Sequence, residues 1–347
     1  MVLVVLLGSA NYGDTMKTIS IITPCYNEEC NVREVYERVR EVMCGLERYS
    51  YEHIFIDNAS TDGTVRVLKT IAGVDTNVKI IVNMRNFGHI RSPFHALYIA
   101  SGDAVISVVA DLQDPPELIS EMVRNWEAGA LAVLAIKRTS EESQAMFRIR
   151  KAYYGLVNRL SSIETFENFT GFGLYDRKVV DAIKDLDDPY PYFRGMIAEI
   201  GMPHVKLFYD QPIRRRGITK NNFYTLYDMA MLGITNLSKV PLRLVTFTGF
   251  ISSALCVVAG LAYTVYKLLY WNRFPGGVAP TVIGLFFVAS LQLFFLGIIG
   301  EYVGAIHTLV QHRPYVFERE RINFEYQPGE PLRSEETVIS GAPNIQR

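Results

Sequence analysis

Two long stretches without a charged residue constrain the fold of this chain more than any other feature. Leu244–Tyr266 runs for 23 residues without a charge, and Phe274–Gly300 runs for 27. At about 1.5 Å per residue, a helix of either length crosses the roughly 30 Å hydrocarbon core of a bilayer. Uncharged helices this long, side by side, are rare in soluble proteins. The sequence therefore predicts a two-helix transmembrane hairpin over residues 243–310.

The part of the chain before this hairpin alternates short strand patterns with helical patterns. Helical spacing follows the first three strands, as in the valines of residues 32–42. The predicted strands are Thr18–Thr23, Tyr51–Ile56, Val78–Val82, Ala104–Val109 and Leu131–Ile136. Strands and helices alternating at this spacing form right-handed βαβ units. The predicted fold class is therefore α/β, with a mostly parallel sheet covered on both faces.

Polar residues follow each of the first four predicted strands. These residues are Tyr26-Asn27-Glu28, Asp57, Arg85-Asn86, and Asp111 with Gln113. Ligands of open α/β sheets bind beyond the carboxyl ends of the strands, so these side chains should converge. Neither a G-x-G-x-x-G pattern nor a P-loop is present. The pattern indicates a nucleotide held by side chains and a metal, without a glycine-rich phosphate cradle.

The stretch Ser107–Glu117, S-V-V-A-D-L-Q-D-P-P-E, carries the candidate metal ligands. An extended segment points residues two apart to the same side, so Asp111 and Gln113 would face one crevice. A carboxylate and an amide oxygen suit Mg²⁺ or Mn²⁺, which keep substrate phosphates as further ligands. Asp114 is expected to cap the next helix, as Asn27 would cap the first. The alternative is a strand, a turn and a capped helix without any metal.

Eight short motifs in order resemble the inverting family 2 glycosyltransferases of the GT-A fold. Within that family they are most similar to the polyprenyl-phosphate branch, which includes dolichyl-phosphate mannose synthases and bactoprenol glucosyltransferases. The similarity covers about residues 17–315. The motifs are P-C-Y-N-E (Pro24–Glu28), D-N-A-S-T-D-G-T (Asp57–Thr64), R-N-F-G (Arg85–Gly88), A-D-L-Q-D-P-P-E (Ala110–Glu117), Y-D-R-K-V-V (Tyr175–Val180), F-R-G (Phe193–Gly195), R-x-x-G-x-T-K (Arg214–Lys220) and G-E-Y-V-G (Gly300–Gly304).

The resemblance implies a role for each motif residue of the nucleotide site. The residues implied to line the nucleotide, with Asp57 on the base, are Pro24, Tyr26, Glu28, Asp57, Asn86 and Gly88. Asp111 and Gln113 would hold Mg²⁺ or Mn²⁺ against the diphosphate, and Asp111 is the first candidate catalytic residue. Asp57 as a turn cap and Tyr26 as a packing residue remain the alternatives.

Three departures from the family pattern bear on catalysis. The family often has D-x-D before L-Q, whereas the first acidic position is Val109 here. The second aspartate of the usual D-D-x-S is Asn58, which we regard as a lesser change. The usual D-F-R-L reads Gly171-Phe172-Gly173-Leu174, which loses an acid and a base together. We expect weaker metal binding with function retained. The last change puts in doubt any catalytic role carried over to that loop, and it is consistent with a different sugar or a different way of holding the acceptor.

The chemistry tolerates these losses because a phosphate monoester acceptor has a second pKa near 6 and is a dianion at neutral pH. It needs no general base, only a metal, positive groups and positioning. Arg214, Arg215, Arg216 and Lys220 lie just before the membrane segment, and of these Arg214 and Lys220 are the candidate catalytic cations. The alternative is that this cluster attracts anionic lipid headgroups.

Composition and charge complete the domain picture. The predicted segments are an N-terminal extension (1–16), a catalytic domain (17–220), a juxtamembrane interfacial helix (221–242), the hairpin (243–310) and a cytoplasmic tail (311–347), disordered from Glu325. The net charge of −1 argues against a nucleic-acid partner. Four cysteines without metal spacing are expected to be reduced, and the apolar N-terminus is too short for a signal peptide. Basic residues on both flanks of the hairpin favour a bacterial-type inner membrane with the catalytic domain and both termini in the cytoplasm.

The leading hypothesis is transfer of a sugar from a UDP- or GDP-sugar to a polyprenyl phosphate, with inversion of the anomeric centre. A processive polysaccharide synthase is a second hypothesis, although Q-x-x-R-W and further spanning helices are not visible. A third hypothesis is a membrane partner that binds sugar nucleotide without turnover, which Val109 and Gly171 motivate. A two-helix hairpin has little to pack against alone, so a homo-oligomer is expected.

Overall fold

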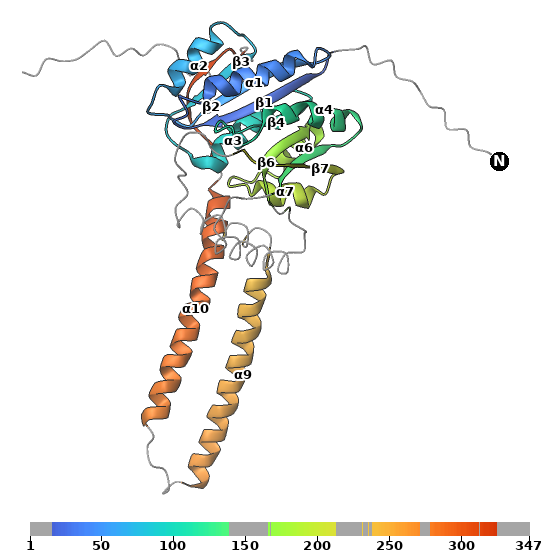
Figure 1. Cartoon of the computed structure of the whole chain (residues 1–347). Helices are drawn as coiled ribbons and strands as arrows, with labels where there is room; N and C mark the ends of the chain where they lie inside the picture. The colour runs from blue at the N-terminus through green and yellow to red at the C-terminus, as the bar shows by residue number, and fades with distance from the viewer. Residues whose placement is uncertain are drawn as a thin grey trace, which may run out of the picture.

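The computed structural model describes residues 16–138, 166, 168–212, 231, 235, 238–270, 278–311 and 313–324. These residues form an α/β domain from which two long helices project side by side (Figure 1). The N-terminal extension, Arg214 to Lys220 and most of the predicted interfacial helix lie outside the described residues.

One eight-stranded sheet runs through the α/β domain in the order β7-β5-β6-β4-β1-β2-β3-β8. Its strands are β1 (Thr18–Cys25), β2 (Ser50–Asp57), β3 (Val78–Asn83), β4 (Ala104–Ser107), β5 (Ala132–Lys137), β6 (Phe169–Asp176), β7 (His204–Tyr209) and β8 (Glu318–Ile322). The four central strands β4, β1, β2 and β3 are parallel, as is the pair β5–β7. The strands β6 and β8 run antiparallel to their neighbours. The sheet is therefore mixed, with the predicted parallel units at its centre.

Helices cover both faces of the sheet because each presents an apolar stripe. The helices are α1 (Val32–Cys44), α2 (Thr64–Ala72), α3 (Gly88–Ile99), the short 3₁₀ helix η1 (Pro116–Leu118), α4 (Ile119–Glu127), α6 (Arg177–Asp185) and α7 (Phe193–Ile200). In α1 the stripe is Val32, Val35, Val39 and Met43, all buried. The buried clusters place α1, α2 and α4 on one face and α3, α6 and α7 on the other.

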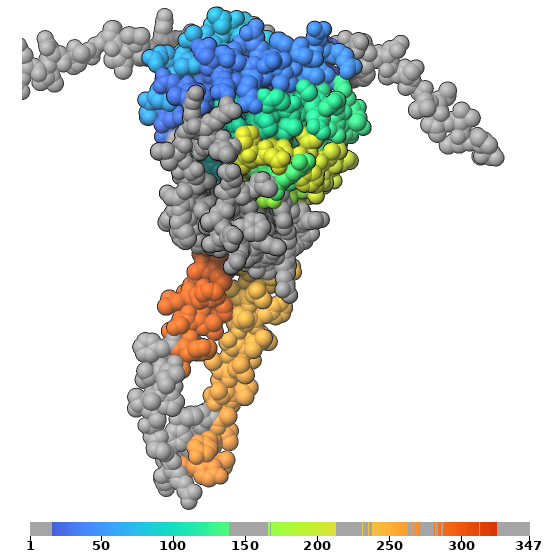
Figure 2. All heavy atoms as spheres, in the orientation of Figure 1, coloured from blue at the N-terminus to red at the C-terminus, as the bar shows by residue number. Residues whose placement is uncertain are grey.

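The predicted hairpin consists of α9 (Val240–Leu269) and α10 (Val278–Val310). Two segments within these helices, Val240–Ala262 and Phe287–Val310, are long and apolar enough to cross a membrane, and their side chains are exposed. Figure 2 shows the described part of the pair standing clear of the α/β domain. The Tyr302 hydroxyl donates a hydrogen bond to the Ser238 carbonyl at 2.6 Å, which joins α10 to the start of α9. The two helices are candidate membrane spans and indicate membrane association.

The chain returns from α10 into the sheet, which the sequence did not predict. Residues from 311 onward were expected to form a tail, yet Glu318–Ile322 is the edge strand β8, paired with β3. Glu318 forms an ion pair with His95 of α3, and the Tyr315 hydroxyl donates to the Asp188 carbonyl at 2.5 Å. Both ends of the hairpin are therefore attached to the same α/β domain.

The structure corrects two predicted helix caps. Asn27 does not cap α1, which begins at Val32; its side chain instead accepts a hydrogen bond from the Thr61 amide at 2.8 Å. Asp114 does not cap the helical segment after it either. Its carboxylate is buried and accepts a hydrogen bond from the Tyr209 hydroxyl at 2.9 Å. In both places a partner distant in sequence competes with the local cap.

Candidate active site

We call the edge of the sheet where β1 to β4 end the rim. A cavity of about 520 Å³, the rim cavity, lies at this edge. Four residues predicted to bind the nucleotide line this rim cavity: Pro24, Tyr26, Asn86 and Gly88. Asn58 and Val109 also line it. Asn58 directly follows Asp57, and Val109 lies two residues before Asp111. The ends of the four parallel strands therefore meet at one cavity, although Asp57, Asp111 and Gln113 are not among the residues that line it.

Asp57 ends β2 beneath the rim and is fully buried. Its Oδ2 accepts a hydrogen bond from the Ser60 amide at 2.9 Å, while its Oδ1 has no partner among the described residues. Burial raises the pKa of this carboxyl above its ordinary value, although the hydrogen bonds from Ser60 and the charge of Arg319 oppose that effect. A buried acceptor oxygen without a donor is costly, so this atom suits an N–H group of a ligand.

The loop after β1 and the loop after β2 are held together by hydrogen bonds from backbone to side chain. The Asn27 amide donates to Ser60 Oγ at 2.8 Å, and the Glu28 amide donates to Thr64 Oγ1 at 2.9 Å. Asn27 adopts a left-handed conformation with φ of 57°, which turns its side chain toward the second loop. The side chain of Glu28 accepts from Asn31 Nδ2 at 2.6 Å, and Glu28 is not among the residues lining the rim cavity.

A reciprocal pair of bonds extends this connection to the start of α2. The Glu29 amide donates to Asp62 Oδ2 at 3.2 Å, and the Gly63 amide donates to Glu29 Oε2 at 3.0 Å. Glu29 also pairs with Arg66 on α2 at 2.9 Å. The carboxylate of Glu29 therefore serves the N-terminus of α2, where negative charge is stabilised by the exposed backbone N–H groups.

The predicted metal ligands lie at a turn and not on an extended strand. The strand β4 ends at Ser107, and Asp111 Oδ1 accepts from the Gln113 amide at 3.1 Å. Leu112 between them is left-handed, with φ of 59°. The prediction that Asp111 and Gln113 face one side because the segment is extended is therefore wrong, since the segment is a turn. Both side chains are half-buried, and they follow Val109 of the cavity wall in the chain.

The residues beneath this turn are tied to distant strands. Asp114 is bonded to Tyr209 at the end of β7, and burial raises the pKa of its carboxyl to about 6. Glu117 forms a bidentate pair with Arg38 of α1, with N–O distances of 2.8 and 2.7 Å. The middle and the last residue of the D-L-Q-D-P-P-E stretch are thus fixed to two different parts of the domain.

The glycines of β6 explain one departure from the family pattern. A Cβ on Gly173 would lie 2.4 Å from the Val133 carbonyl of β5, so the close pairing of these strands requires glycine there. Gly171 has φ of +103° and lines the rim cavity, and its carbonyl accepts from the Tyr175 hydroxyl at 2.7 Å. Of the Gly171–Leu174 segment, Gly171 therefore belongs to the cavity wall, while Gly173 serves the strand pairing.

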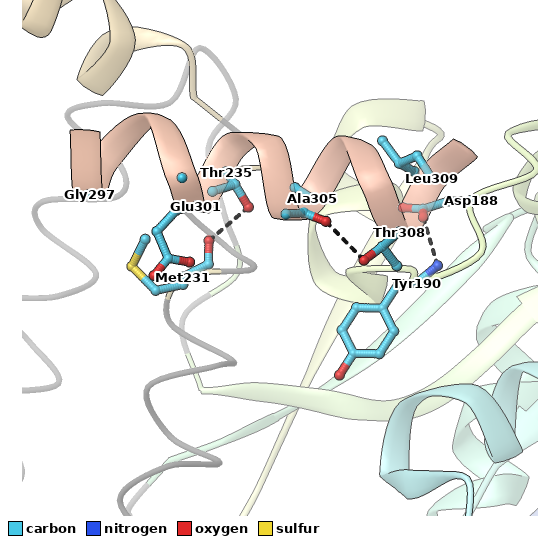
Figure 3. A pocket seen from close by; sticks show the side chains of 11 residues that line it. Asp188, Tyr190, Met231, Thr235, Gly297, Glu301, Ala305, Thr308 and Leu309 are labelled. Atoms are coloured by element: carbon cyan, nitrogen blue, oxygen red, sulfur yellow. Dashed lines mark hydrogen bonds between the residues drawn. The ribbon is translucent and has the colours of Figure 1, made fainter. Parts of the chain in front are cut away.

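A second cavity, of about 560 Å³, lies where α10 meets the α/β domain, and we call it the junction cavity (Figure 3). The α10 side contributes Gly297, Glu301 and Thr308, and the loop before α7 contributes Asp188 and Tyr190. Glu301, the acidic residue of the G-E-Y-V-G motif, lines this cavity.

Comparison with known proteins identifies the family. Residues 20–184 match the family described as Glycosyl transferase family 2, and residues 240–306 match the GtrB C-terminal hairpin. An uncharacterized glycosyltransferase of Synechocystis is 34% identical over 315 residues, covering 90% of this chain and 98% of the relative. A bactoprenol glucosyl transferase of Shigella phage SfV is 33% identical over 306 residues, covering 87% and 99%. The chain belongs to glycosyltransferase family 2.

A solved structure, glucosyl-3-phosphoglycerate synthase from Mycobacterium tuberculosis, is 18% identical with a TM-score of 0.45, covering 63% of this chain and 76% of that one. In this chain the α/β domain, most of which the family 2 match covers, is followed by the apolar hairpin that the match at residues 240–306 describes. The resemblance stated from the motifs is confirmed.

Sequence reasoning missed several residues of the rim cavity. Arg194 of α7 lines it, and although F-R-G was noted as a motif, no role was assigned to its arginine. Thr170 and Tyr192 also line it, and neither residue belongs to one of the eight motifs. Asn58 was treated as a minor departure, yet its side chain makes four hydrogen bonds at the rim. Arg214 and Lys220 lie outside the described residues.

Proposed function

We propose that this glycosyltransferase moves a sugar from a UDP- or GDP-sugar to a polyprenyl phosphate such as undecaprenyl or dolichyl phosphate. The observation that carries the proposal is that the α/β domain holding the rim cavity is attached to the apolar hairpin at both of its ends. A water-soluble donor reaches the rim, while a lipid acceptor stays beside the helices. Relatives named bactoprenol glucosyl transferase at 33% identity support the same class of acceptor.

The nucleotide side of the rim has the features that a nucleoside diphosphate needs. Tyr26 and Pro24 give the cavity an apolar wall, and Asn86 and Gly88 give it polar groups. Asp57 Oδ1 accepts an N–H of the base in this arrangement, and both uracil and guanine carry such a group. Glu28 acts through its backbone contact with the second loop.

Asp111 and Gln113 are the residues that would hold Mg²⁺ or Mn²⁺. A carboxylate and an amide carbonyl are hard oxygen donors, which both cations prefer. No group of three or more acidic, His or Cys side chains forms a metal cage among the described residues, so the remaining ligands come from phosphate and water. When bound, the cation neutralises charge on the leaving diphosphate.

The reaction then needs no protein base. A phosphate oxygen of the acceptor attacks the anomeric carbon, the bond from that carbon to the nucleoside diphosphate breaks, and the diphosphate leaves with the bonding electrons. Attack opposite the leaving group inverts the α-linked donor to a β-linked product. Arg194, in the cavity wall, is placed to attract one of the two phosphates, and Arg214 and Lys220 remain proposed cations for the same task.

The lipid acceptor enters this proposal from the hairpin side. The junction cavity lies between α10 and the domain, next to the Asp188–Tyr190 loop. Lys239 precedes the first span, Arg243 lies in its first turns and Arg313 follows the second span, which favours a cytoplasmic α/β domain in a bacterial-type inner membrane. The exposed apolar faces of α9 and α10 favour a homo-oligomer. Labelling of introduced cysteines in intact cells tests the orientation in the membrane. Light scattering of the purified protein tests the oligomeric state.

The deciding experiment measures transfer from radiolabelled UDP-glucose, UDP-galactose, UDP-GlcNAc and GDP-mannose into organic-extractable undecaprenyl phosphate. It is run on the full-length protein with Mg²⁺, with Mn²⁺ and with EDTA. Asp111→Ala is the test variant, and Asp181→Ala is its matched control because that exposed carboxylate lies on α6, away from the rim. We expect labelled lipid from at least one donor, lost with EDTA and with Asp111→Ala and retained with Asp181→Ala.

Two outcomes would overturn the proposal in different ways. Binding of a donor without any lipid product favours the non-catalytic partner hypothesis. Labelled polysaccharide in place of labelled lipid favours the processive synthase hypothesis.

A further inference from the structure

Asn58 connects the end of β2 to the loop after β3. Its side chain is almost fully buried, 7% exposed, directly after Asp57. The Oδ1 atom accepts from the Phe87 amide at 2.8 Å and from Asn83 Nδ2 at 3.2 Å. The Nδ2 atom donates to Asn86 Oδ1 at 2.9 Å and to the Gly88 carbonyl at 3.1 Å. Apart from the bond to Asn83, these side-chain hydrogen bonds all go to the Arg85–Gly88 segment, which we call the RNFG loop.

The backbone of the RNFG loop fixes which way the amide points. The Phe87 N–H can only donate and the Gly88 carbonyl can only accept, so the oxygen must face the first and the nitrogen the second. A carboxylate at this position would place an oxygen against two acceptors, Asn86 Oδ1 and the Gly88 carbonyl. The arrangement therefore requires an amide, and aspartate is not equivalent to it.

The residues that Asn58 holds are those that face the donor. Asn86 and Gly88 both line the rim cavity, and Asn58 lines it with them. Gly88 adopts φ of +88° as it begins α3, and its amide donates to Asn86 Oδ1 at 2.8 Å. The side-chain amide of Asn58 thus accepts a hydrogen bond from one backbone group of the bent loop and donates one to another.

We propose that Asn58 is a positioning residue, which holds the RNFG loop in the shape that binds the nucleotide sugar and does so through the direction of its amide. The family pattern to which the motifs are similar has aspartate here, so the amide marks a different way of fixing this loop in this chain. The inference rests on the proposed function for its ligand, but the hydrogen-bond arrangement can be tested without any ligand.

The test compares Asn58→Asp with Asn86→Asp by hydrogen exchange of the full-length protein. Both variants add one negative charge within the same cluster. Asn86 accepts through Oδ1 in both of its side-chain bonds given above, so aspartate keeps both, whereas Asn58→Asp loses two donated bonds. We expect exchange in peptides spanning residues 84–92 to be about tenfold faster in Asn58→Asp, a change of about 1.4 kcal/mol, and to change less than twofold in Asn86→Asp.

The strands β1 to β4 serve as the internal control, because their exchange should match the native protein in both variants. If Asn58→Asp does not fold, Asn58→Ala removes all four side-chain hydrogen bonds without adding charge and should also open the loop. Equal acceleration in Asn58→Asp and Asn86→Asp would mean that charge matters and amide direction does not. Unchanged exchange of residues 84–92 in Asn58→Asp or in Asn58→Ala would likewise overturn the proposal.

Transfer kinetics separate positioning from general destabilisation. We expect Asn58→Asp to raise the KM for the donor about tenfold while kcat changes much less, because the loop contacts the nucleotide and not the reacting atoms. A loss in kcat at unchanged KM would show a smaller active fraction and contradict the positioning role. If the native protein transfers no sugar, the proposed function fails while the exchange result still decides the role of Asn58.

Discussion

The two halves of the rim differ in how they are held. On the nucleotide side, the loops after β1, β2 and β3 are joined by hydrogen bonds that pass from one loop to the next, as from Asn27 to Ser60 and from Asn58 to Phe87. On the metal side, Asp111 Oδ1 accepts a hydrogen bond from the amide of Gln113, two residues along the chain. The nucleotide side is therefore held by contacts between loops. We propose that it is formed before the donor arrives, whereas the metal side takes further ligands from the donor.

The largest effect should come from removing charge on the metal side. Asp111→Asn keeps an oxygen that can accept from the Gln113 amide but loses the negative charge. We expect the transfer rate to fall at least about a hundredfold, as for loss of a group that stabilises developing charge. The thermal unfolding midpoint should stay unchanged, since the turn keeps its bond. Transfer within tenfold of the native rate would contradict the metal role, and Asp181→Asn is the control.

The next largest effect concerns the sheet beneath the metal side. Gly173→Ala places a Cβ 2.4 Å from the Val133 carbonyl, a backbone atom that cannot move aside. We expect a loss of about 2–3 kcal/mol in the free energy of unfolding, measured as a lower unfolding midpoint of the full-length protein. Gly73→Ala is the matched control because its Cβ would meet only ordinary contacts, the nearest at 3.4 Å. Equal midpoints for the two variants would show that β5 and β6 can separate.

A smaller effect follows from Asp57 on the nucleotide side. Burial raises the pKa of this carboxyl above its ordinary 3.8, so the native state favours the protonated form and its contribution to stability falls as pH rises through the folded pKa. A base N–H needs the carboxylate, so nucleotide affinity should fall as pH drops through the same range. Asp57→Asn should bind about tenfold more weakly above that range and lose this pH dependence. Calorimetric titration with UDP and with GDP across pH gives the ratio of variant to native affinity; a constant ratio would contradict this role.

The smallest effect should come from the contact between the first two loops. In Gly63→Ala the new Cβ would lie 2.0 Å from Glu29 Oε1, but that carboxylate is the end of a flexible side chain and can move. Because φ at Gly63 is −79°, alanine adds no backbone strain. We expect a loss of about 1 kcal/mol or less, with a modest rise in donor KM. A severe loss would show that the Glu29–Gly63 bond holds the whole nucleotide side.

The central strands and most of the rim were predictable from local patterns. Each of the first four strands is a short β-branched or apolar run that ends at a proline or a polar residue, and the observed bounds differ by two residues or fewer. Because parallel strands share one carboxyl edge, Tyr26, Asn86 and Asp57 could be grouped before any coordinates were known.

The remaining features depend on partners that are distant in sequence. The local sequence predicts Asp114 to be a helix cap, but its buried carboxylate accepts a hydrogen bond from the Tyr209 hydroxyl, 95 residues away. The strand β8 has the sequence E-R-E-R-I, which lacks an apolar face, and its pairing depends on where α10 delivers it. The side-chain amide of Asn58 is bonded to a bent loop that lies 29 residues further along the chain. No local pattern carries that information.

The return of the chain into the sheet at β8 sets an order for biosynthesis. The strands β1 to β7 leave the ribosome before α9 and α10, so the outer edge of β3 waits until both helices have been made. An open strand edge is a template for pairing with other chains, and unfinished domains are prone to such errors. Synthesis of both hairpin helices thus precedes completion of the sheet. A fragment cut before residue 313 lacks its edge strand, whereas a soluble version that replaces the hairpin with a short linker and keeps residues 313–324 retains it.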